Sequence, residues 1–201
     1  KTARFDDEFY YEGDDLGVHP VGSHTDFALW APTANRVMVE VYVDDVKELR
    51  EMKRTAKGVF RHRYNRNLHG NGYLYHILVN GKWNQTTDPI ARSSFANNKM
   101  SAVIDYKKID VENFSKNLPP FKNQTDAILY ELSVRDFSMM SEGNIPKRGK
   151  FMAFTHENTK TDAGYSTGIS YIKELGVTHV QIMPMYDFAT VDELNVSAFY
   201  N

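Results

Sequence analysis

The sequence predicts two kinds of structure in one chain: an all-β, immunoglobulin-like sandwich in the first half and a parallel βαβ unit in the second. Three observations predict this. Valines recur at every second position over residues 37–43, Asn80-Gly81 separates two strand-like segments, and after Asp126 the pattern changes to two apolar segments flanking one helix. A period of two is typical of a half-buried strand, whereas strand–helix–strand is typical of a parallel sheet.

Short strands account for the first half, residues 1–110. Besides the valine segment, the predicted strands are residues 27–30, 60–64, 73–79 and 102–104. The Asn-Gly pair predicts a type I′ hairpin turn, because both of its central residues need positive φ, and the strand pattern resumes at residues 82–83. No helical pattern is visible before about residue 110. Short strands with regular turns favour a β-sandwich.

A linker is predicted at residues 111–125, where Pro119-Pro120 stiffens the chain. Residues 126–201 then form the second domain, with apolar strands at 127–134 and 179–183. Between them, Ser166 or Thr167 is predicted to cap a helix that ends at Gly176. The polar segment 139–167 is too long for a routine connection, and we predict that it is functional or mobile.

Composition excludes several functions. The 201 residues contain no cysteine, which excludes disulfides, thiolate metal sites and a cysteine nucleophile. A net charge of −2 does not indicate a basic surface for nucleic acid. No apolar run approaches the roughly 20 residues that a membrane-spanning helix needs. The histidines lack metal-ligand spacing, and phosphate-loop and nucleophile-elbow motifs are absent. We therefore expect no nucleic-acid or membrane partner, no metal and no organic cofactor. No signal peptide is visible, which slightly favours the cytoplasm.

Carboxylates are the candidate chemical groups. Asp136 and Asp187 each follow a predicted parallel strand, and α/β barrels carry out their chemistry at that end of the strands. Two facing carboxylates about 5 Å apart could be the acid and nucleophile of a retaining glycosidase. The favoured interpretation is structural: Asp136 pairs with Arg135, and Asp187 caps a loop, because neither lies in a catalytic motif. The acidic cluster over residues 6–15 lacks calcium-loop spacing and is predicted to be solvated.

Two tryptophans are the candidate binding residues, because aromatic rings stack on the C–H faces of sugars as well as packing in cores. Trp30 lies in an apolar run directly before Ala31-Pro32 and is predicted to be a core residue. Trp83 follows a polar turn and precedes polar residues, so core packing and sugar binding are both open for it.

Several segments resemble known glucan-active proteins. Residues 27–34 (Phe-Ala-Leu-Trp-Ala-Pro-Thr-Ala) resemble the opening strand of the starch- and glycogen-binding modules that precede debranching and branching enzymes. Residues 130–138 (Tyr-Glu-Leu-Ser-Val-Arg-Asp-Phe-Ser) resemble the first barrel strand of type I pullulanases, in the alpha-amylase clan. Residues 167–181 and 187–193 are similar to that family almost residue for residue, and Tyr200-Asn201 match the start of its signature Tyr-Asn-Trp-Gly-Tyr-Asp-Pro. Ser133 departs from the histidine of many relatives.

The resemblance implies a fold and an activity. It implies that residues 126–201 are the first βαβ portion of a (β/α)8 TIM barrel, supplying two of its eight strands. The parent protein would hydrolyse α-1,6-glucosidic branches in pullulan, glycogen or limit dextrins with retention. The family's catalytic carboxylates lie on later strands, so no residue of this chain is expected to be catalytic, and the chain alone is expected to be inactive. The implied partners are an α-glucan and the remainder of the barrel.

The resemblance also implies binding residues. In the related glycogen-binding modules two tryptophans hold the glucan; Trp83 matches one of them, and Asn98 falls near the position of a polar contact. The second tryptophan has no counterpart after Val43. Asp187, Tyr200 and Asn201 are expected to line the substrate cleft together with the segment 139–167. The alternative function is a non-catalytic carbohydrate-binding module for α-glucans.

Overall fold

A computed structural model describes residues 3–44, 46–111, 121–186, 190–195 and 197. The chain divides into two compact units, one of Lys1–Phe114 with Ala189–Asn201 and the other of Ser115–Phe188. The predicted linker prolines Pro119 and Pro120 lie outside the described residues.

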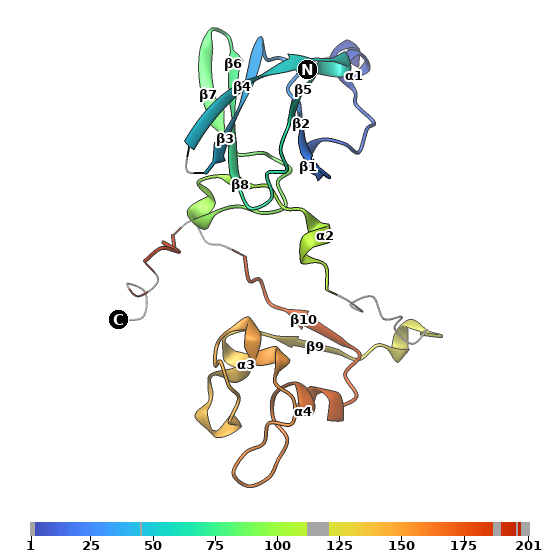
Figure 1. The fold of residues 1–201 in the computed structure, drawn as a ribbon. Helices are drawn as coiled ribbons and strands as arrows, with labels where there is room; N and C mark the ends of the chain where they lie inside the picture. The colour runs from blue at the N-terminus through green and yellow to red at the C-terminus, as the bar shows by residue number, and fades with distance from the viewer. Residues whose placement is uncertain (1–2, 45, 112–120, 187–189, 196, 198–201) are drawn as a thin grey trace. The chain divides into compact units, whose positions relative to one another are not determined.

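The first unit is built on one antiparallel sheet (Figure 1). Its strands are β1 (Gly17–Val21), β2 (His24–Trp30), β3 (Arg36–Val43), β4 (Val46–Arg54), β5 (Val59–Tyr64), β6 (Gly72–Val79), β7 (Lys82–Thr86) and β8 (Ser101–Ala102). The order is β1-β2-β5-β4-β3-β6-β7, with β8 paired to β6. The predicted β structure of the first half is therefore confirmed at the level of a curled antiparallel sheet, which is consistent with a β-sandwich.

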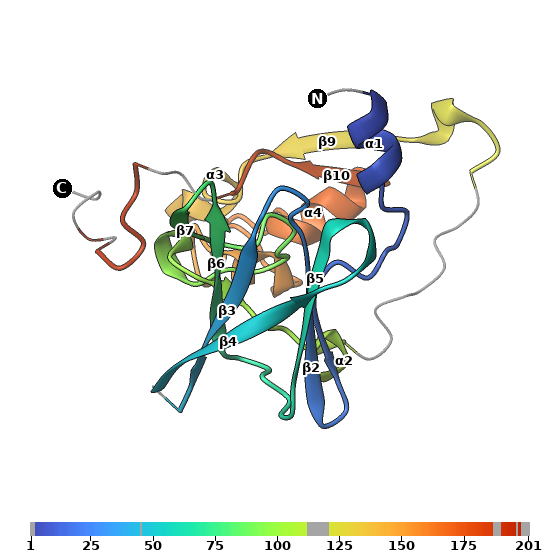
Figure 2. The same ribbon diagram turned by 90° about the horizontal axis from the view of Figure 1, so that it is seen from above.

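Strand β4 connects the two halves of this sheet. It pairs with β3 along seven residues, from Met52 to Val46, but with β5 through only two residue pairs. Such a short connection lets the β2–β5 half turn back over the β3–β6 half, and Figure 2 shows the two groups of strands on either side of the core. Phe27, Leu29 and Phe60 from one half pack in a single cluster with the inward residues of the other.

Strand β3 supplies the centre of that cluster. Val37, Val39, Val41 and Val43 are all buried, as the alternation predicts, and each stabilises the fold by about 1.5–3 kcal/mol when its side chain leaves water. The intervening residues therefore belong to the opposite, outer face of the sheet. The β6–β7 turn is also confirmed: Asn80 and Gly81 both have positive φ, at 51° and 75°, so that Val79 pairs with Lys82.

Helices before residue 110 are a correction to the sequence prediction. Helix α1 (Ala3–Phe9) and helix α2 (Tyr106–Ile109) both lie in the first half. In α1 the rings of Phe5 and Phe9 meet at the i, i+4 spacing, with centroids 4.9 Å apart. In α2 the Asp105 side chain caps the helix by accepting a hydrogen bond from the backbone N–H of Lys107. Both helices are too short for periodicity to reveal them.

The second unit contains the predicted strand, helix and strand. These are β9 (Leu129–Leu132), α4 (Gly168–Glu174) and β10 (His179–Ile182), and β9 and β10 pair in parallel. Thr167 occupies the N-cap position, but its hydroxyl bonds the carbonyl of Gly143 instead of capping the helix. Both strands are shorter than predicted and expose apolar side chains, with Leu129 63% exposed.

Short helical turns occupy the long polar segment 139–167. It begins at the end of α3 (Asp136–Met139) and includes the 3₁₀ turns Ser141–Gly143 and Phe151–Thr155. Two hydrogen bonds tie it together, since Asn144 Nδ2 donates to the Lys160 carbonyl at 3.0 Å and to Asp162 Oδ1 at 2.9 Å. The other short turns of the chain are Ala56–Gly58, Ala96–Asn98 and Gln124–Asp126.

We expect Gly58→Ala to destabilise the first unit more than Gly81→Ala. Both glycines have φ of +75°, so the left-handed strain of about 1–2 kcal/mol is common to both variants. A Cβ at Gly58 would lie 2.6 Å from Pro32 Cα, whereas nothing lies within 4 Å of a Cβ at Gly81. The overlap should cost roughly 1–3 kcal/mol more, measured by urea unfolding. Equal losses in the two variants would contradict the close approach of Gly58 to Pro32.

Candidate functional site

The outer face of β3, β6 and β7 carries the candidate site. Cross-strand pairing places Arg36, Leu78 and Trp83 in one row, because Arg36 pairs with Leu78 and Leu78 pairs with Trp83. Side chains of directly paired residues share a face of an antiparallel sheet. The next row on this face contains Met38, His76 and Gln85. We call these six residues the outer sheet face.

Trp83 is the most prominent side chain of the outer sheet face. It is 42% exposed, and β7 is exposed along its whole length, so the structure favours a surface role over core packing for this residue. The Arg36 guanidinium lies 5.9 Å from the centre of the indole ring and donates to Glu51 Oε1 at 2.9 Å. A cation near an aromatic face is weakly attracted to it and limits the positions of the ring.

A buried carboxylate supports the second row. Glu40 is fully buried, and it accepts hydrogen bonds from Lys47 at 2.8 Å, from His76 at 2.6 Å and from the Tyr42 hydroxyl. Burial acts to raise the pKa of Glu40, but these three hydrogen bonds outweigh it and hold the pKa below its usual value. Gln85 Nε2 lies 3.4 Å from the same His76 nitrogen. The network therefore fixes His76 beside Gln85 on the exposed face.

This arrangement suits a sugar chain. A partly exposed indole offers an apolar plane for the C–H face of a pyranose, and polar side chains beside it can bond the hydroxyls. Sequence reasoning found Trp83 but missed Arg36, His76 and Gln85. The Asn-Gly turn could have revealed His76 and Gln85, because its type fixes the register and so places Trp83 and Gln85 opposite Leu78 and His76. Arg36 belongs to β3, whose register the turn does not set.

Asn98 lies away from Trp83. It belongs to the loop between Ser94 and Ser101, and Ser101 pairs with Tyr73 at the start of β6, whereas Trp83 pairs with Leu78 near its end. These β6 residues are five positions apart, or roughly 16 Å at about 3.3 Å per residue (Figure 1). The Asn98 amide oxygen accepts a hydrogen bond from the Ser94 hydroxyl at 2.7 Å. The structure therefore does not bring the two predicted glucan contacts into one small site.

Asn97, the neighbour of Asn98, forms hydrogen bonds with Asp192 and Glu193, which lie far from it in the sequence. The Asn97 side chain donates to Asp192 Oδ1 at 2.8 Å and accepts from the backbone N–H of Glu193 at 2.8 Å, while its own backbone N–H donates to the Glu193 carboxylate. The hydrogen bond from Asn97 lowers the pKa of Asp192. Left-handed φ at Asn97, at 59°, turns the amide toward this segment.

Trp30 is not a core residue, which corrects the sequence prediction. It is 37% exposed, because alternation along β2 directs Leu29 into the core and Trp30 to the other face. The apolar run 27–30 carries side chains on both faces of the strand, so its composition alone does not place Trp30 in the core.

Of the two predicted carboxylates, only Asp136 lies among the described residues, so their pairing is not tested. Asp136 lies at the start of α3, and its carboxylate is 3.6 Å from Arg135 Nη1, as the structural interpretation expects. Asp187, Tyr200 and Asn201 lie outside the described residues. Within the described ranges, no group of three or more metal-ligating side chains is arranged around a common point, and no helix has the length and hydropathy to cross a membrane.

Comparison with known proteins defines the class of the first unit. Residues 15–91 match the family model of carbohydrate-binding module 48, the isoamylase N-terminal domain. These residues include β1 to β7 and hence the whole outer sheet face. Residues 15–91 of the first unit are therefore similar to a carbohydrate-binding module of this family.

Similarity to pullulanases extends over the whole chain. The pullulanase of Bacillus subtilis (strain 168) is 38% identical over 202 residues, which cover 100% of this chain and 28% of the relative. Pullulanase 1, chloroplastic, of Arabidopsis thaliana is 29% identical over 94% of this chain and 20% of the relative. The chain thus spans less than a third of these relatives, and the resemblance to type I pullulanases is confirmed.

Solved structures agree with this result. The crystal structure of pullulanase type I from Bacillus subtilis, complexed with maltose, has a TM-score of 0.87 and 38% identity, covering 96% of this chain and 27% of that one. The pullulanase of Paenibacillus barengoltzii, in complex with maltohexaose and alpha-cyclodextrin, has a TM-score of 0.88 and 36% identity, covering 98% of this chain and 31% of that one.

We expect Asn97→Ala to release the segment around Asp192. The pKa of Asp192 should rise toward its usual value, because the hydrogen bond that lowers it is lost, and the Glu193 amide should exchange faster with solvent. NMR titration and hydrogen exchange measure the two effects. The matched control is Asn98→Ala, which introduces the same residue at a similar φ of 53° but leaves the contacts with Asp192 and Glu193 in place. Equal effects of both variants would contradict a specific role of Asn97.

Proposed function

We propose that this chain is part of a pullulanase-type glycoside hydrolase that cleaves α-1,6-glucosidic branches in pullulan, glycogen or limit dextrins with retention. The observation that carries the proposal is the similarity to pullulanases over the whole chain, at 38% identity and including both units rather than the binding module alone. If the binding module were joined to an unrelated domain, the similarity to pullulanases would extend over the residues of the module alone.

The second unit supports a barrel as the fold of the remainder. Parallel strands occur almost only in sheets that are covered on both faces, yet Leu129, Val180 and Ile182 are exposed in the β9–β10 pair. These side chains require further polypeptide over them. We propose an immunoglobulin-like sandwich at 1–110, a linker at 111–125, and the first βαβ portion of a (β/α)8 barrel at 126–201, where Pro119-Pro120 and the parallel pair support the division.

The chemistry proposed for the whole protein is a two-carboxylate double displacement. One carboxylic acid protonates the leaving oxygen while a carboxylate attacks the sugar and forms a covalent glycosyl intermediate. Asp136 follows the end of β9, and its carboxylate is 3.6 Å from Arg135 Nη1. By the resemblance to the family, the catalytic carboxylates are assigned to later strands, with Asp187, Tyr200 and Asn201 proposed to line the cleft by their match to family motifs.

The proposed partner of the first unit is an α-glucan on the outer sheet face. The exposed indole of Trp83 and the fixed pair of His76 and Gln85 support this proposal. Two pullulanases with the same fold were crystallised with maltose and with maltohexaose. Asn98 is proposed as a further contact, and its separation from Trp83 means that only a glucan of several units would touch both.

The 201-residue chain alone is expected to release no reducing sugar from pullulan. Neither the acid nor the nucleophile of the reaction is among its residues, so neither protonation nor attack is available. The protein translated from the whole natural reading frame should hydrolyse pullulan in the same assay. If that frame stops at Asn201, or its product binds pullulan without cleaving it, the alternative of a non-catalytic binding module stands instead.

Replacing Trp83 by alanine should weaken the binding of maltoheptaose by about 1–2 kcal/mol, or roughly 5- to 30-fold in Kd, because the sugar loses its stacking surface. Thermal stability should change little, since the ring is 42% exposed. Calorimetric titration beside a melting curve measures both effects. The control is Tyr165→Ala, which removes an exposed aromatic ring from the second unit. Unchanged affinity together with a clear loss of stability would end the binding role of Trp83.

A further inference from the structure

A hollow lies where helix α1 meets the sheet, away from the outer sheet face. Its volume is about 320 Å³, and Phe9, Tyr10, Tyr11 and Trp30 are among the residues that line it. Trp30 ends β2, which is near one end of the strand order, whereas Trp83 belongs to β7 at the other end. This hollow, which we call the α1 hollow, has no part in the proposed binding of glucan at Trp83.

The indole of Trp30 is held in place by two other segments. Its Nε1–H donates to the carbonyl of Phe9 at 3.0 Å and to the carbonyl of Lys57 at 3.1 Å. Lys57 in turn donates through Nζ to the carbonyl of Asp7 at 3.0 Å, which ties α1 to the same place. The ring is thus fixed while 37% of the residue stays exposed. A side chain ordered in advance loses less conformational entropy when a ligand binds.

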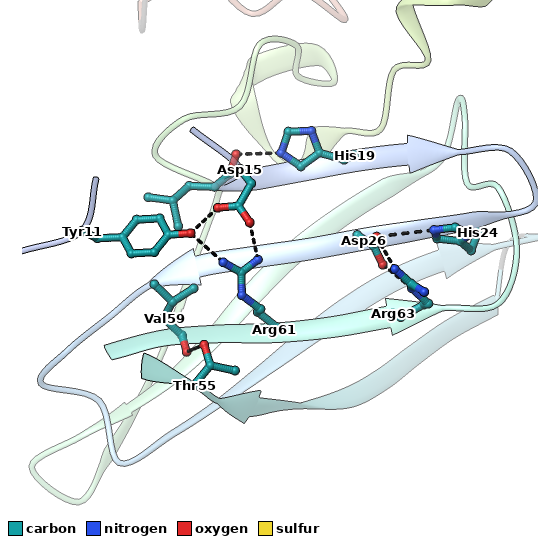
Figure 3. Close-up of polar contacts among 10 residues, drawn as sticks. Tyr11, Asp15, His19, His24, Asp26, Thr55, Val59, Arg61 and Arg63 are labelled. Atoms are coloured by element: carbon teal, nitrogen blue, oxygen red, sulfur yellow. Dashed lines mark hydrogen bonds and ion pairs between the residues drawn. The ribbon is translucent and has the colours of Figure 1, made fainter. Parts of the chain in front are cut away.

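A second aromatic wall is anchored in a similar way (Figure 3). The Tyr11 hydroxyl donates to the Asp15 carboxylate and accepts from Arg61 Nη2 at 2.7 Å, and Arg61 Nη1 lies 2.8 Å from Asp15 Oδ2. The hydrogen bond to Asp15 raises the pKa of Tyr11, so the phenol stays neutral. Arg61 belongs to β5, and the Tyr11 ring is therefore fastened to the sheet.

Tyr10 and the charged residues at the rim of the α1 hollow determine which class of ligand the hollow can bind. Tyr10 is 64% exposed and can close over a ligand from the solvent side. The rim continues into a neighbouring hollow lined by Asp6, Asp7, Glu12 and Lys57, where acids outnumber bases. Such a rim repels anions and offers carboxylate acceptors to hydroxyl groups. Aromatic walls with acceptor groups at the rim suit a neutral, hydroxyl-rich ring with apolar faces.

We propose that the α1 hollow is a second α-glucan-binding site, which takes one or two glucose units against Trp30, Tyr10 and Tyr11. Its volume is at the low end of the roughly 300–1,000 Å³ of small-molecule sites, which matches a short oligosaccharide or a chain end. The choice of an α-glucan as the ligand rests on the proposed function. The existence of the site rests on the fixed rings and on the charge of the rim.

The two tryptophans make the test direct, since the sequence contains no others. In a Trp83→Phe variant of the 201-residue chain, Trp30 is the only indole, and its fluorescence should change saturably on titration with maltotetraose. Adding Tyr10→Ala, an exposed position, should weaken that response about fivefold through the loss of one stacking surface. Adding Tyr165→Ala instead should leave it unchanged. Cellotetraose, which has β-linkages, should bind more weakly than maltotetraose.

Three outcomes would overturn the proposal: no response of Trp30 to maltotetraose, a response that Tyr10→Ala leaves intact, or a response to a short oligolysine peptide in place of the glucan. The reciprocal variant Trp30→Phe leaves Trp83 as the reporter of the outer sheet face, so failure of the α1 hollow is separable from failure of that face. Pullulan hydrolysis by the whole protein tests the proposed function independently of both.

Discussion

Strand β3 separates the core of the first unit from its outer sheet face, because its side chains alternate between the two. Four valines on one side pack against Phe27, Phe60 and the β6 tyrosines, while Arg36 and Met38 on the other side begin the two rows of the candidate site. A shift of one residue in the β3–β6 register would exchange these faces and expose the valines. Exposing these valines to water would cost free energy, and this cost favours the observed register. The packing of the core therefore also determines the positions of Trp83 and Gln85 on the outer sheet face.

The Glu40 network shows how this face tolerates a buried charge. A carboxylate without solvent is costly unless it is paired and hydrogen-bonded, and Glu40 is bonded by Lys47, His76 and Tyr42. Such a group contributes little net stability compared with an apolar residue, but it orients its partners. His76 is held at a single position by it, next to Gln85. Glu40 therefore affects the outer sheet face indirectly, by positioning the side chain of His76.

Much of this architecture could be predicted from the sequence, and the failures have physical reasons. The valine period, the Asn-Gly turn and the helix after Thr167 could be predicted because each shows as a pattern within a few neighbouring residues. Trp30 was misplaced because an apolar run does not show which of its members face the core. Helix α1 was missed because its seven residues make only about two turns, too few for a repeating apolar pattern to stand out. The separation of Trp83 from Asn98 depends on where β7 and β8 pair along β6, and sequence spacing does not contain that information.

The two units obey different packing rules, and this difference bears on function. The curled antiparallel sheet encloses its own core, so it can present fixed rings on its surface, Trp83 on one half and Trp30 on the other. The parallel β9–β10 pair and its helix bury only a few apolar side chains, among them Leu132 and Ile172, and leave Leu129 and Val180 exposed. If both proposed sites bind glucan, they would hold one polysaccharide at two points, and the second contact would form at a high effective concentration. Under the proposed function, even a weak second site would then be enough to keep a branched chain near the catalytic part of the whole protein.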